Sequence, residues 1–474
     1  MLRLPVNPTD NPSPEALRAF LEQCVAISRE AGRPQLVSIS MAVESLDPLA
    51  VLESIFEPGE LHFYAERPSS GFAVAGAEAV LEFSVNGATR FAQAKAFIEE
   101  TLANTIAVGP LDEPFAGPHF YAAAGFANDT AVNAPFPALR VFVPRWQVSR
   151  MGDGSVAVAN LLVAPELPLD LVATKVWNAH AKFRAFDYSS AQGQPRPSAP
   201  KRVEEIGGDG SYQRAVGAAL EEIARGAYEK IVLARAQRLT TAEEFHLLGV
   251  LNHLRQRYAG CYAFSVANGR GQSFIGATPE RLVRVANGRM HTEALAGSAP
   301  RGKSASEDAA LARGLMQSEK DLREHRLVIG SIERRVADLG IKLEHAATPR
   351  LLPLANVQHL HTPISATLPD GVHILDLVAR LHPTPAVGGT PREAAVSAIP
   401  RLEAFSRGLY AGTCGWVDHR GGGEFFVGLR SALIDGNTAI AYAGAGIVAG
   451  SDPKNEFAET ELKFKALIEA LTQS

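Results

Sequence analysis

The apolar positions in the second half of the chain alternate between a helical and an extended spacing. A helical spacing follows residue 210, where apolar side chains recur at i, i+4, i+7, i+8 and i+11: Tyr212, Val216, Ala219, Leu220 and Ile223. The next segment, 230–235, is rich in β-branched residues and predicts a strand. Strand pairs then flank Asn-Gly turns, at 261–267 with 272–276 and on either side of Asn287. These are antiparallel hairpins, which argue against a doubly wound parallel sheet.

Longer elements complete this pattern. Helices are predicted at 306–339 and 453–471, with strands near 415–418, 424–434 and 438–443 between them. The first half shows one helical pattern, 14–29, and the strand-like runs 35–41, 79–85 and 138–143. We therefore expect an α+β fold with large antiparallel sheets.

The chain divides into three parts by composition. Residues 1–190 carry no motif with evident chemistry, and 191–203 are rich in proline and polar residues and are typical of a linker or long loop. Residues 204–474 hold every segment with candidate functional residues. We expect this last part to be the catalytic region, with the first part completing the fold.

Charge and cysteine content exclude several classes of protein. Lys and Arg number 46 against 51 Asp and Glu, so the net charge of −5 offers no general field for nucleic acid or an anionic membrane. Three widely spaced cysteines form neither a disulfide framework nor a CxxC metal site. The N-terminus lacks the apolar core of a signal peptide, and no run of 18 apolar residues exists. We expect a cytoplasmic protein with no nucleic-acid or membrane partner.

Carboxylates interrupt the apolar stripes of two predicted helices. Asp321 and Glu324 share a helix face with Val328 and Ile332, and Glu456 and Glu459 are spaced in the same way near the C-terminus: these two pairs suit Mg²⁺, which prefers hard oxygen ligands. The alternatives are a solvated edge paired with a neighbouring arginine, Arg323 or Arg326, and a surface ion-pair ladder of Glu456, Glu459 and Lys463.

Two further features each have a plain alternative. The small residues of 441–448 include Gly444 and Gly446, where backbone N–H groups could approach an anion, although a tight turn explains them as well. Lys230 alone is typical of a surface lysine, and Glu280 follows a strand in a predicted loop, where a charged residue needs no special reason.

Taken in order, the segments resemble one family. The motifs are EKIVLAR at 229–235, GATPERL at 276–282, EALAGSAPRG at 293–302, SEKDLREH at 318–325, NVQHL at 356–360, LHPTPAVGG at 381–389, GLYAGTCGW at 408–416, FFVGLRSAL at 425–433 and YAGAGIVAGSDPKNEF at 442–457. This order resembles the chorismate-utilising enzymes, which include isochorismate, salicylate, anthranilate and aminodeoxychorismate synthases. The resemblance implies an αββα sandwich in which residues 1–190 are the divergent N-terminal part.

The resemblance also implies a site. Glu324 and Glu456 match the principal Mg²⁺ ligands of the family, and Asp321 and Glu459 match residues that hold metal-bound waters. The metal would bind the ring carboxylate of chorismate. The positions that match substrate-binding residues are Gly297, Ser298, His359, Tyr410, Arg430, Gly446 and Lys463, among which Tyr410, Arg430 and the backbone of Gly446 would hold the enolpyruvyl carboxylate.

Lys230 and Glu280 decide the branch of the family that is implied. Members that use water as the nucleophile have a lysine where Lys230 stands, so Lys230 would activate water and Glu280 would protonate the departing C4 hydroxyl. Both should lie in a water-poor site. We expect an isochorismate synthase serving menaquinone or siderophore biosynthesis, a monomer or homodimer without an obligatory glutaminase subunit. Salicylate synthase, an aminating relative and a non-enzymatic chorismate- or anion-binding protein remain the alternatives.

Overall fold

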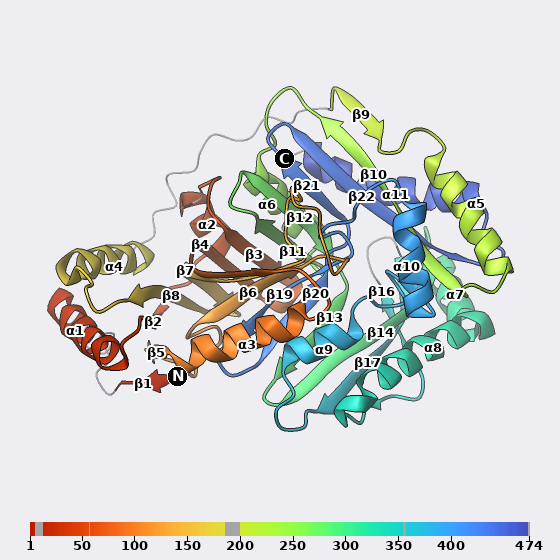
Figure 1. The fold of residues 1–474 in the computed structure, drawn as a ribbon. Coiled ribbons are helices and arrows are strands. Elements are labelled where there is room, and N and C mark those ends of the chain that lie inside the picture. Colours follow the sequence, from red (N-terminus) through yellow and green to blue (C-terminus); the bar gives the residue numbers. More distant parts are fainter. Residues whose placement is uncertain (5–12, 56, 185–199, 354–356, 473–474) are drawn as a thin grey trace.

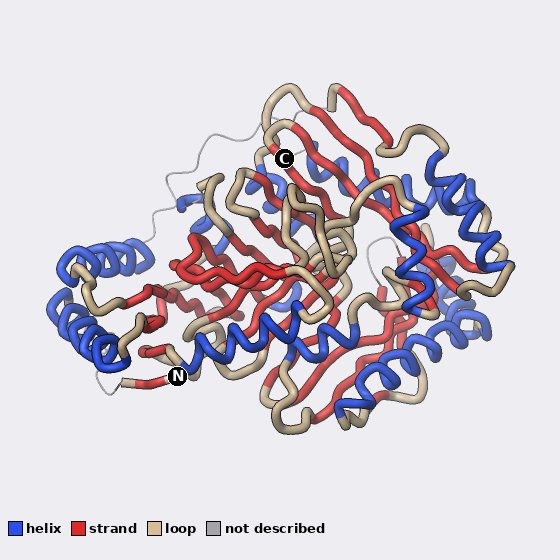
Figure 2. The backbone as a smooth tube through the Cα atoms, viewed as in Figure 1, coloured by secondary structure: helices blue, strands red, loops and turns tan. Residues whose placement is uncertain are grey.

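The structure is a computed structural model, which describes residues 1–4, 13–55, 57–184, 200–353 and 357–472. Two layers of antiparallel strands face each other, and helices cover their outer surfaces (Figures 1 and 2). This is the α+β sandwich expected from the sequence, and the predicted hairpins are confirmed.

The first layer is a chain of hydrogen-bonded strands that begins beside the C-terminal region. In spatial order it contains β9 (Arg202–Glu205), β10 (Lys230–Thr240), β22 (Thr438–Val448), β21 (Ser431–Asp435), β12 (Gln272–Thr278), β11 (Tyr262–Ala267), β3 (His62–Arg67), β4 (Phe72–Val85) and β7 (Leu139–Met151). It continues through β8 (Gly154–Val163), β2 (Gln35–Val43), β5 (Thr105–Val108) and β1 (Leu2–Arg3). Only the pairings of β5 with β1 and with β2 are parallel among the described strands.

The second layer branches from β7. Its order is β6 (His119–Ala124), β19 (Thr413–Asp418), β20 (Gly423–Val427), β13 (Arg281–Ala286), β14 (Arg289–Pro300) and β17 (Val357–Thr367), with β15 (Glu344–His345) and β16 (Arg350–Pro353) beyond β17. The short β18 (Gly389–Thr390) pairs with the start of β10. Strands from residues 1–190 therefore pair with strands from residues 204–474 in both layers, as β3 does with β11 and β6 with β19.

Aromatic side chains fill the space between the layers. Phe63 of β3 stacks on Tyr121 of β6 with ring centroids 4.6 Å apart, and Tyr262 of β11 stacks on Phe426 of β20 at 5.1 Å. All four are at most 2% exposed. Such pairs contribute about 0.5–1.5 kcal/mol each beyond the burial of their surface, so they hold the two layers in register.

Helices cover both outer faces. On the first layer lie α2 (Pro48–Ile55), α5 (Ser211–Ala224), α6 (Leu247–Arg257), α10 (Arg392–Leu402) and α11 (Pro453–Thr472). On the second lie α7 (Ala305–Gln317), α8 (Glu319–Val336) and α9 (Ile374–Leu381), and α3 (Arg90–Ala103) packs against α9 and against β4 and β7. Helices α1 (Pro14–Ala31) and α4 (Leu169–Arg184) pack together at one end (Figure 1). No helix among the described residues has the length and apolarity needed to span a membrane.

Two predicted elements are divided in the structure. The helix expected at 306–339 breaks at Ser318, whose backbone is extended and whose hydroxyl caps α8 by accepting from the Asp321 amide at 3.3 Å. The strand expected at 424–434 separates into β20 and β21, and Arg430 between them has a φ of 47°. Of the predicted linker 191–203, residues 191–199 lie outside the described residues, and 202–203 begin β9.

Candidate active site

Lys230 and Glu324 meet across the two layers at one end of the sandwich. Lys230 is the first residue of β10, and Glu324 lies in the second turn of α8. The Lys230 Nζ is 3.2 Å from the Glu324 Oε1, and the two side chains are 24% and 42% exposed. The sequence left open whether Glu324 pairs with a neighbouring arginine of its own helix. In the structure its partner is Lys230, 94 positions away in the chain.

The glycines of 441–448 give room to site side chains. They lie within β22, which pairs with β10 along its whole length, so the alternative of a tight turn is wrong. A Cβ atom at Gly446 would lie 3.0 Å from the Lys230 Cε, and one at Gly444 would lie 2.8 Å from the Tyr410 hydroxyl. Contacts that short require the neighbour to move. The absence of a side chain at Gly444 and at Gly446 therefore leaves the space that Tyr410 and Lys230 occupy.

Glu280 lies just before β13, where the chain passes between the layers. Burial raises its pKa to about 7, the charge of Glu293 adds to this, and a hydrogen bond from the Thr384 hydroxyl and the charge of Lys230 oppose it. The Thr384 Oγ1 donates to the Glu280 Oε1 at 3.3 Å. The side chain is half-buried. A carboxylic acid with a pKa near 7 can donate a proton at neutral pH, which an ordinary glutamate rarely does.

Tyr410 lies beside Glu280. It is 4% exposed, and its pKa is raised, first by burial and also by the charges of Glu403 and Glu280. Its ring stacks on Tyr442 of β22 with centroids 5.1 Å apart. Tyr410 therefore stays a neutral hydrogen-bonding phenol at all ordinary pH values.

The remaining predicted substrate-binding residues form a second group around His359. The Ser298 hydroxyl and the His359 Nδ1 are 2.7 Å apart, because Ser298 of β14 pairs directly with His359 of β17. Burial lowers the pKa of His359, and the charges of Arg430 and Lys463 lower it further. His359 is thus neutral at pH 7 and lies near two cations that can receive an anion.

Gly297 marks the place where β14 passes closest to α8. Its φ is 80°, and a Cβ atom there would lie 3.1 Å from the Cβ of Asp321 and 3.1 Å from the Leu360 side chain. Both the backbone conformation and the close approach require glycine. The irregular part of β14 that carries Gly297 and Ser298 is thereby held against the helix that carries Asp321 and Glu324.

The four predicted metal-binding carboxylates come from α8 and α11 but have other partners. Asp321 accepts a short hydrogen bond from Ser318, Glu324 binds Lys230, and Glu459 pairs with Lys463 at 2.8 Å. This last contact is the ion pair of the surface-ladder alternative. Burial raises the pKa of Glu456, and the charge of Glu459 adds to this. Across the described ranges, no three His, Cys, Asp or Glu side chains converge closely enough to hold a metal ion.

The donor set nevertheless suits Mg²⁺ with an incomplete protein shell. Mg²⁺ is usually bound through one or two carboxylates, with waters and substrate oxygens filling the other positions. Glu456 is a carboxylate that burial and a like charge make unfavourable to ionise, and a nearby cation would relieve both effects. The residues present therefore fit a site that the substrate completes.

A buried ion pair that sequence reasoning missed holds the strand carrying Lys230. Arg407 and Glu403 are 4% and 9% exposed and approach within 2.5 Å. Arg407 donates to the Val232 carbonyl at 2.7 Å, and Glu403 accepts from the Ala234 amide at 2.8 Å. Arg407 stands directly before the GLYAGTCGW motif, but a single arginine in a polar segment gives no signal of burial.

Comparison with known proteins places the chain in a family. The family model described as "Chorismate binding enzyme" matches residues 19–472. The "Salicylate biosynthesis isochorismate synthase" of Pseudomonas aeruginosa is 35% identical and covers 96% of this chain and 94% of its own length. The "Isochorismate synthase MenF" of Bacillus subtilis is 32% identical, covering 94% and 95%.

Solved structures agree with these sequence matches. The structure of the menaquinone-specific isochorismate synthase MenF from Escherichia coli superposes with a TM-score of 0.78 at 27% identity, covering 95% of this chain and 99% of that one. Anthranilate synthase component I from Streptococcus pneumoniae, at 19% identity and a TM-score of 0.68, shares the fold. The chain belongs to the family of chorismate-binding enzymes.

Proposed function

We infer that the chain is an isochorismate synthase, an isomerase that adds water at C2 of chorismate while the C4 hydroxyl leaves. Two relatives that match nearly the whole chain carry this name. The observation that carries the proposal is the pKa of Glu280, which is about 7, together with the position of Lys230 close enough for its charge to act on that pKa. The reaction needs a proton acceptor and a proton donor, and these two side chains provide them.

In the proposed mechanism, Lys230 accepts a proton from the attacking water and Glu280 protonates the departing hydroxyl. Lys230 acts here as the neutral amine: its hydrogen bond to Glu324 at 3.2 Å holds the amino group in place, and Gly446 leaves the space beside it open. Thr384 orients the Glu280 carboxyl. After the forward reaction Lys230 holds an extra proton and Glu280 has lost one, so in the reverse reaction Glu280 is the base and Lys230 the acid.

Arg430, Tyr410 and the backbone of Gly446 hold the enolpyruvyl carboxylate in this proposal. A guanidinium can bind a carboxylate with two parallel hydrogen bonds. The charge of Arg430 lowers the pKa of His359, which is the residue proposed to line the substrate ring. Lys463, Gly297 and Ser298 border the ring carboxylate. These assignments follow the family's motifs. They are supported by the Ser298–His359 contact and by the charges of Arg430 and Lys463 near His359.

Glu324 and Glu456 would hold Mg²⁺, with Asp321 and Glu459 binding its water ligands. The ion supplies a positive charge for the ring carboxylate of chorismate and fixes the ring relative to the protein. With Mg²⁺ bound, Glu324 would have a positive partner besides Lys230.

Product analysis tests the proposed function. The purified chain is incubated with chorismate and Mg²⁺, and the products are separated by chromatography. We expect isochorismate in equilibrium with chorismate. Salicylate together with pyruvate would identify a salicylate synthase, aminated products formed with ammonium would identify an aminating enzyme, and no turnover would identify a binding protein.

The roles of Lys230 and Glu280 are separable with ammonia. Ammonia carries its own lone pair, so Lys230→Ala should lose water addition, by ~10²–10⁴-fold, while retaining formation of 2-amino-2-deoxyisochorismate at raised pH. Glu280→Gln should lose both reactions because both share the leaving group. Isochorismate formation at the parent rate by Lys230→Ala would disprove the base assignment.

Four further properties belong to this proposal. We expect the enzyme to act without a glutaminase subunit, as a monomer or homodimer, and to serve menaquinone or siderophore synthesis. A cytoplasmic location fits its three cysteines, which are all buried as free thiols.

A further inference from the structure

A buried tyrosine hydroxyl lies near the two carboxylates that α11 contributes to the candidate active site. Tyr212 is the second residue of α5 and is 4% exposed. Its hydroxyl oxygen is buried and has no hydrogen-bond partner among the residues that the structure describes. A buried tyrosine hydroxyl normally has a partner, because burial removes its hydrogen bonds to water. Tyr212 therefore either destabilises the fold without compensation or has a partner that becomes available when a ligand binds.

Packing between α5 and α11 places Tyr212 next to the first turn of α11. The two helices are in contact, and the Arg235 guanidinium lies between side chains of both. Its Cζ is 3.8 Å from the ring centroid of Phe457 and 5.8 Å from that of Tyr212. Phe457 directly follows Glu456 in the chain. Arg235 also donates to the Thr460 hydroxyl of α11 at 2.8 Å, so it holds this part of α11 beside Tyr212.

The charges around Tyr212 agree with this position. Burial raises the pKa of Tyr212 well above its usual value, the charge of Glu456 adds more than any other charge, and Tyr410 and Glu459 add less. The hydroxyl therefore stays protonated and can donate a hydrogen bond. A carboxylate is the strongest acceptor that a side chain can offer such a donor.

Glu456 is the better acceptor of the two carboxylates. Glu459 is 53% exposed and already pairs with Lys463 at 2.8 Å. Glu456 is half-buried and has a hydrogen bond from Ser451, and none of the ion pairs between described residues includes it. An ionised carboxylate can accept about four hydrogen bonds. Glu456 therefore has acceptor capacity left for a buried donor.

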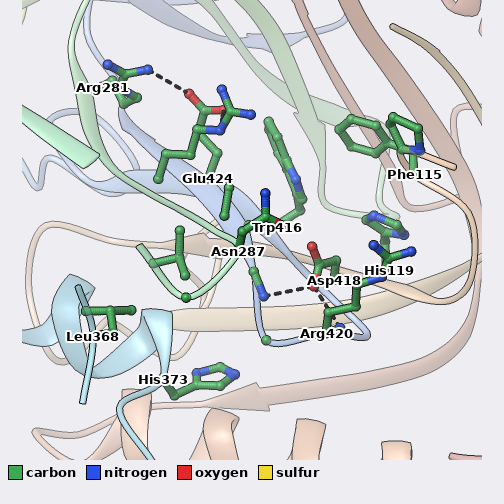
Figure 3. Close-up of a pocket in the computed structure, with 18 of the residues that line it drawn as sticks. Phe115, His119, Arg281, Asn287, Leu368, His373, Trp416, Asp418, Arg420 and Glu424 are labelled. Atoms are coloured by element: carbon green, nitrogen blue, oxygen red, sulfur yellow. Dashed lines mark hydrogen bonds and ion pairs between the residues drawn. The ribbon is translucent and has the colours of Figure 1, made fainter. Parts of the chain in front are cut away.

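Two other buried tyrosines in this protein have the contact that Tyr212 lacks. The Tyr64 hydroxyl donates to Glu66, and the Tyr262 hydroxyl donates to Glu424. Glu424 lies beside Arg281 in the wall of a separate cavity of about 590 Å³ (Figure 3), and no described residue of α5 or α11 lines that cavity. Tyr212 differs from this pair of tyrosines because it lies near carboxylates without a bond to either.

We propose that Tyr212 is a positioning residue of the metal site, whose hydroxyl donates to the Glu456 carboxylate when that carboxylate binds Mg²⁺. This inference rests on the metal site of the proposed function. Carboxylates that bind a metal are normally oriented by hydrogen bonds from neighbouring groups. The hydroxyl would orient Glu456 and offset the like charge of Glu459. Because it has no partner without the ion, it favours the occupied site over the empty one.

Tyr212→Phe removes only the hydroxyl and tests this proposal by Mg²⁺ binding. Isothermal titration calorimetry with MgCl₂, at a fixed chorismate concentration, should show a Kd about tenfold or more above that of the parent. In EDTA the Tm of the variant should equal or exceed that of the parent, because the hydroxyl that is lost has no partner there. Tyr228→Phe is the matched control. Tyr228 is 3% exposed, and the charges acting on it are those of Glu222, Arg401 and Arg225, outside the site. This control should bind Mg²⁺ as the parent does.

The same substitution in a Glu459→Gln background identifies the carboxylate. If the hydroxyl acts through Glu456, the tenfold loss should persist there. The proposal is overturned if Tyr212→Phe binds Mg²⁺ at parent affinity, if its Tm in EDTA is lower, if Tyr228→Phe weakens binding equally, or if the loss disappears in the Glu459→Gln background. A parent that does not bind Mg²⁺ would overturn both this inference and the metal assignment. A parent that binds Mg²⁺ but forms no isochorismate would contradict only the proposed function.

Discussion

Glu280→Gln should stabilise the protein at pH 8 while abolishing its activity. Burial raises the pKa of Glu280 from an ordinary 4.5 to about 7. The folded state therefore keeps a proton that the unfolded state has lost, and stability falls as pH rises between these two values. At 1.36 kcal/mol for each pKa unit the full cost is about 3 kcal/mol. Since the side chain is only half-buried, we discount it to about 1–2 kcal/mol.

Urea unfolding of the parent and the variant at pH 5 and pH 8 measures this cost. Glutamine cannot ionise, so the variant should be more stable than the parent by about 1–2 kcal/mol at pH 8, and the difference should shrink toward pH 5. Glu293→Gln is the matched control with the opposite sign. Although burial opposes it, the hydrogen bond from His361 and the charge of Arg281 lower the pKa of Glu293.

The Glu293 carboxylate therefore stabilises the fold above the unfolded pKa, and that stability is lost as pH falls through the lower folded value. Glu293→Gln should be less stable than the parent at pH 8. The reasoning fails if Glu280→Gln is no more stable than the parent at pH 8, or if its advantage is the same at both pH values. Either result would mean that the Glu280 carboxyl ionises without penalty.

Three other substitutions test the site. Glu324→Gln should raise the Mg²⁺ concentration for half-maximal activity about tenfold or more, and full activity in EDTA would contradict the metal assignment. Arg430→Ala should lower kcat/KM ~30- to 150-fold, as expected for about 2–3 kcal/mol from a charged hydrogen bond, without lowering Tm. Gly446→Ala places a Cβ 3.0 Å from the Lys230 Cε. It should lower kcat at least ~10-fold without changing Tm. A kcat equal to that of the parent would show that Lys230 can be displaced without loss of activity.

Most helices and strands could be predicted because the patterns that indicate them involve only residues close together in the sequence. The Asn-Gly turn at Asn287 and the apolar stripe of α5 need only neighbouring residues to be recognised, and both were found in place. The break at Ser318 was missed because helix spacing continues through it in the sequence. Serine is neutral enough inside a helix that its capping role shows only when its partner amide is known.

Family resemblance supplied a set of candidate site residues, but it could not supply their geometry. Spacing alone placed Glu324 among ordinary surface acids, since its contact with Lys230 joins segments 94 positions apart. Arg407 and Glu403 hold the strand of Lys230 because both charges are buried. Charged residues in a loop-like segment are normally exposed, so nothing in the sequence indicated this burial. Tertiary packing alone supplies this information.

The pairing of β3 with β11 and of β6 with β19 has a consequence for biosynthesis of the chain. Once residues 1–190 have left the ribosome, β3 and β6 can pair with β4 and β7, but their other neighbours, β11 and β19, have not yet been made. Their unpaired edges would be open to pairing with other chains until some 220 further residues, through β19, have been made. Fragments cut between the two parts should therefore aggregate when expressed singly and become soluble when expressed together. That result would show that the two differently composed parts fold as one unit.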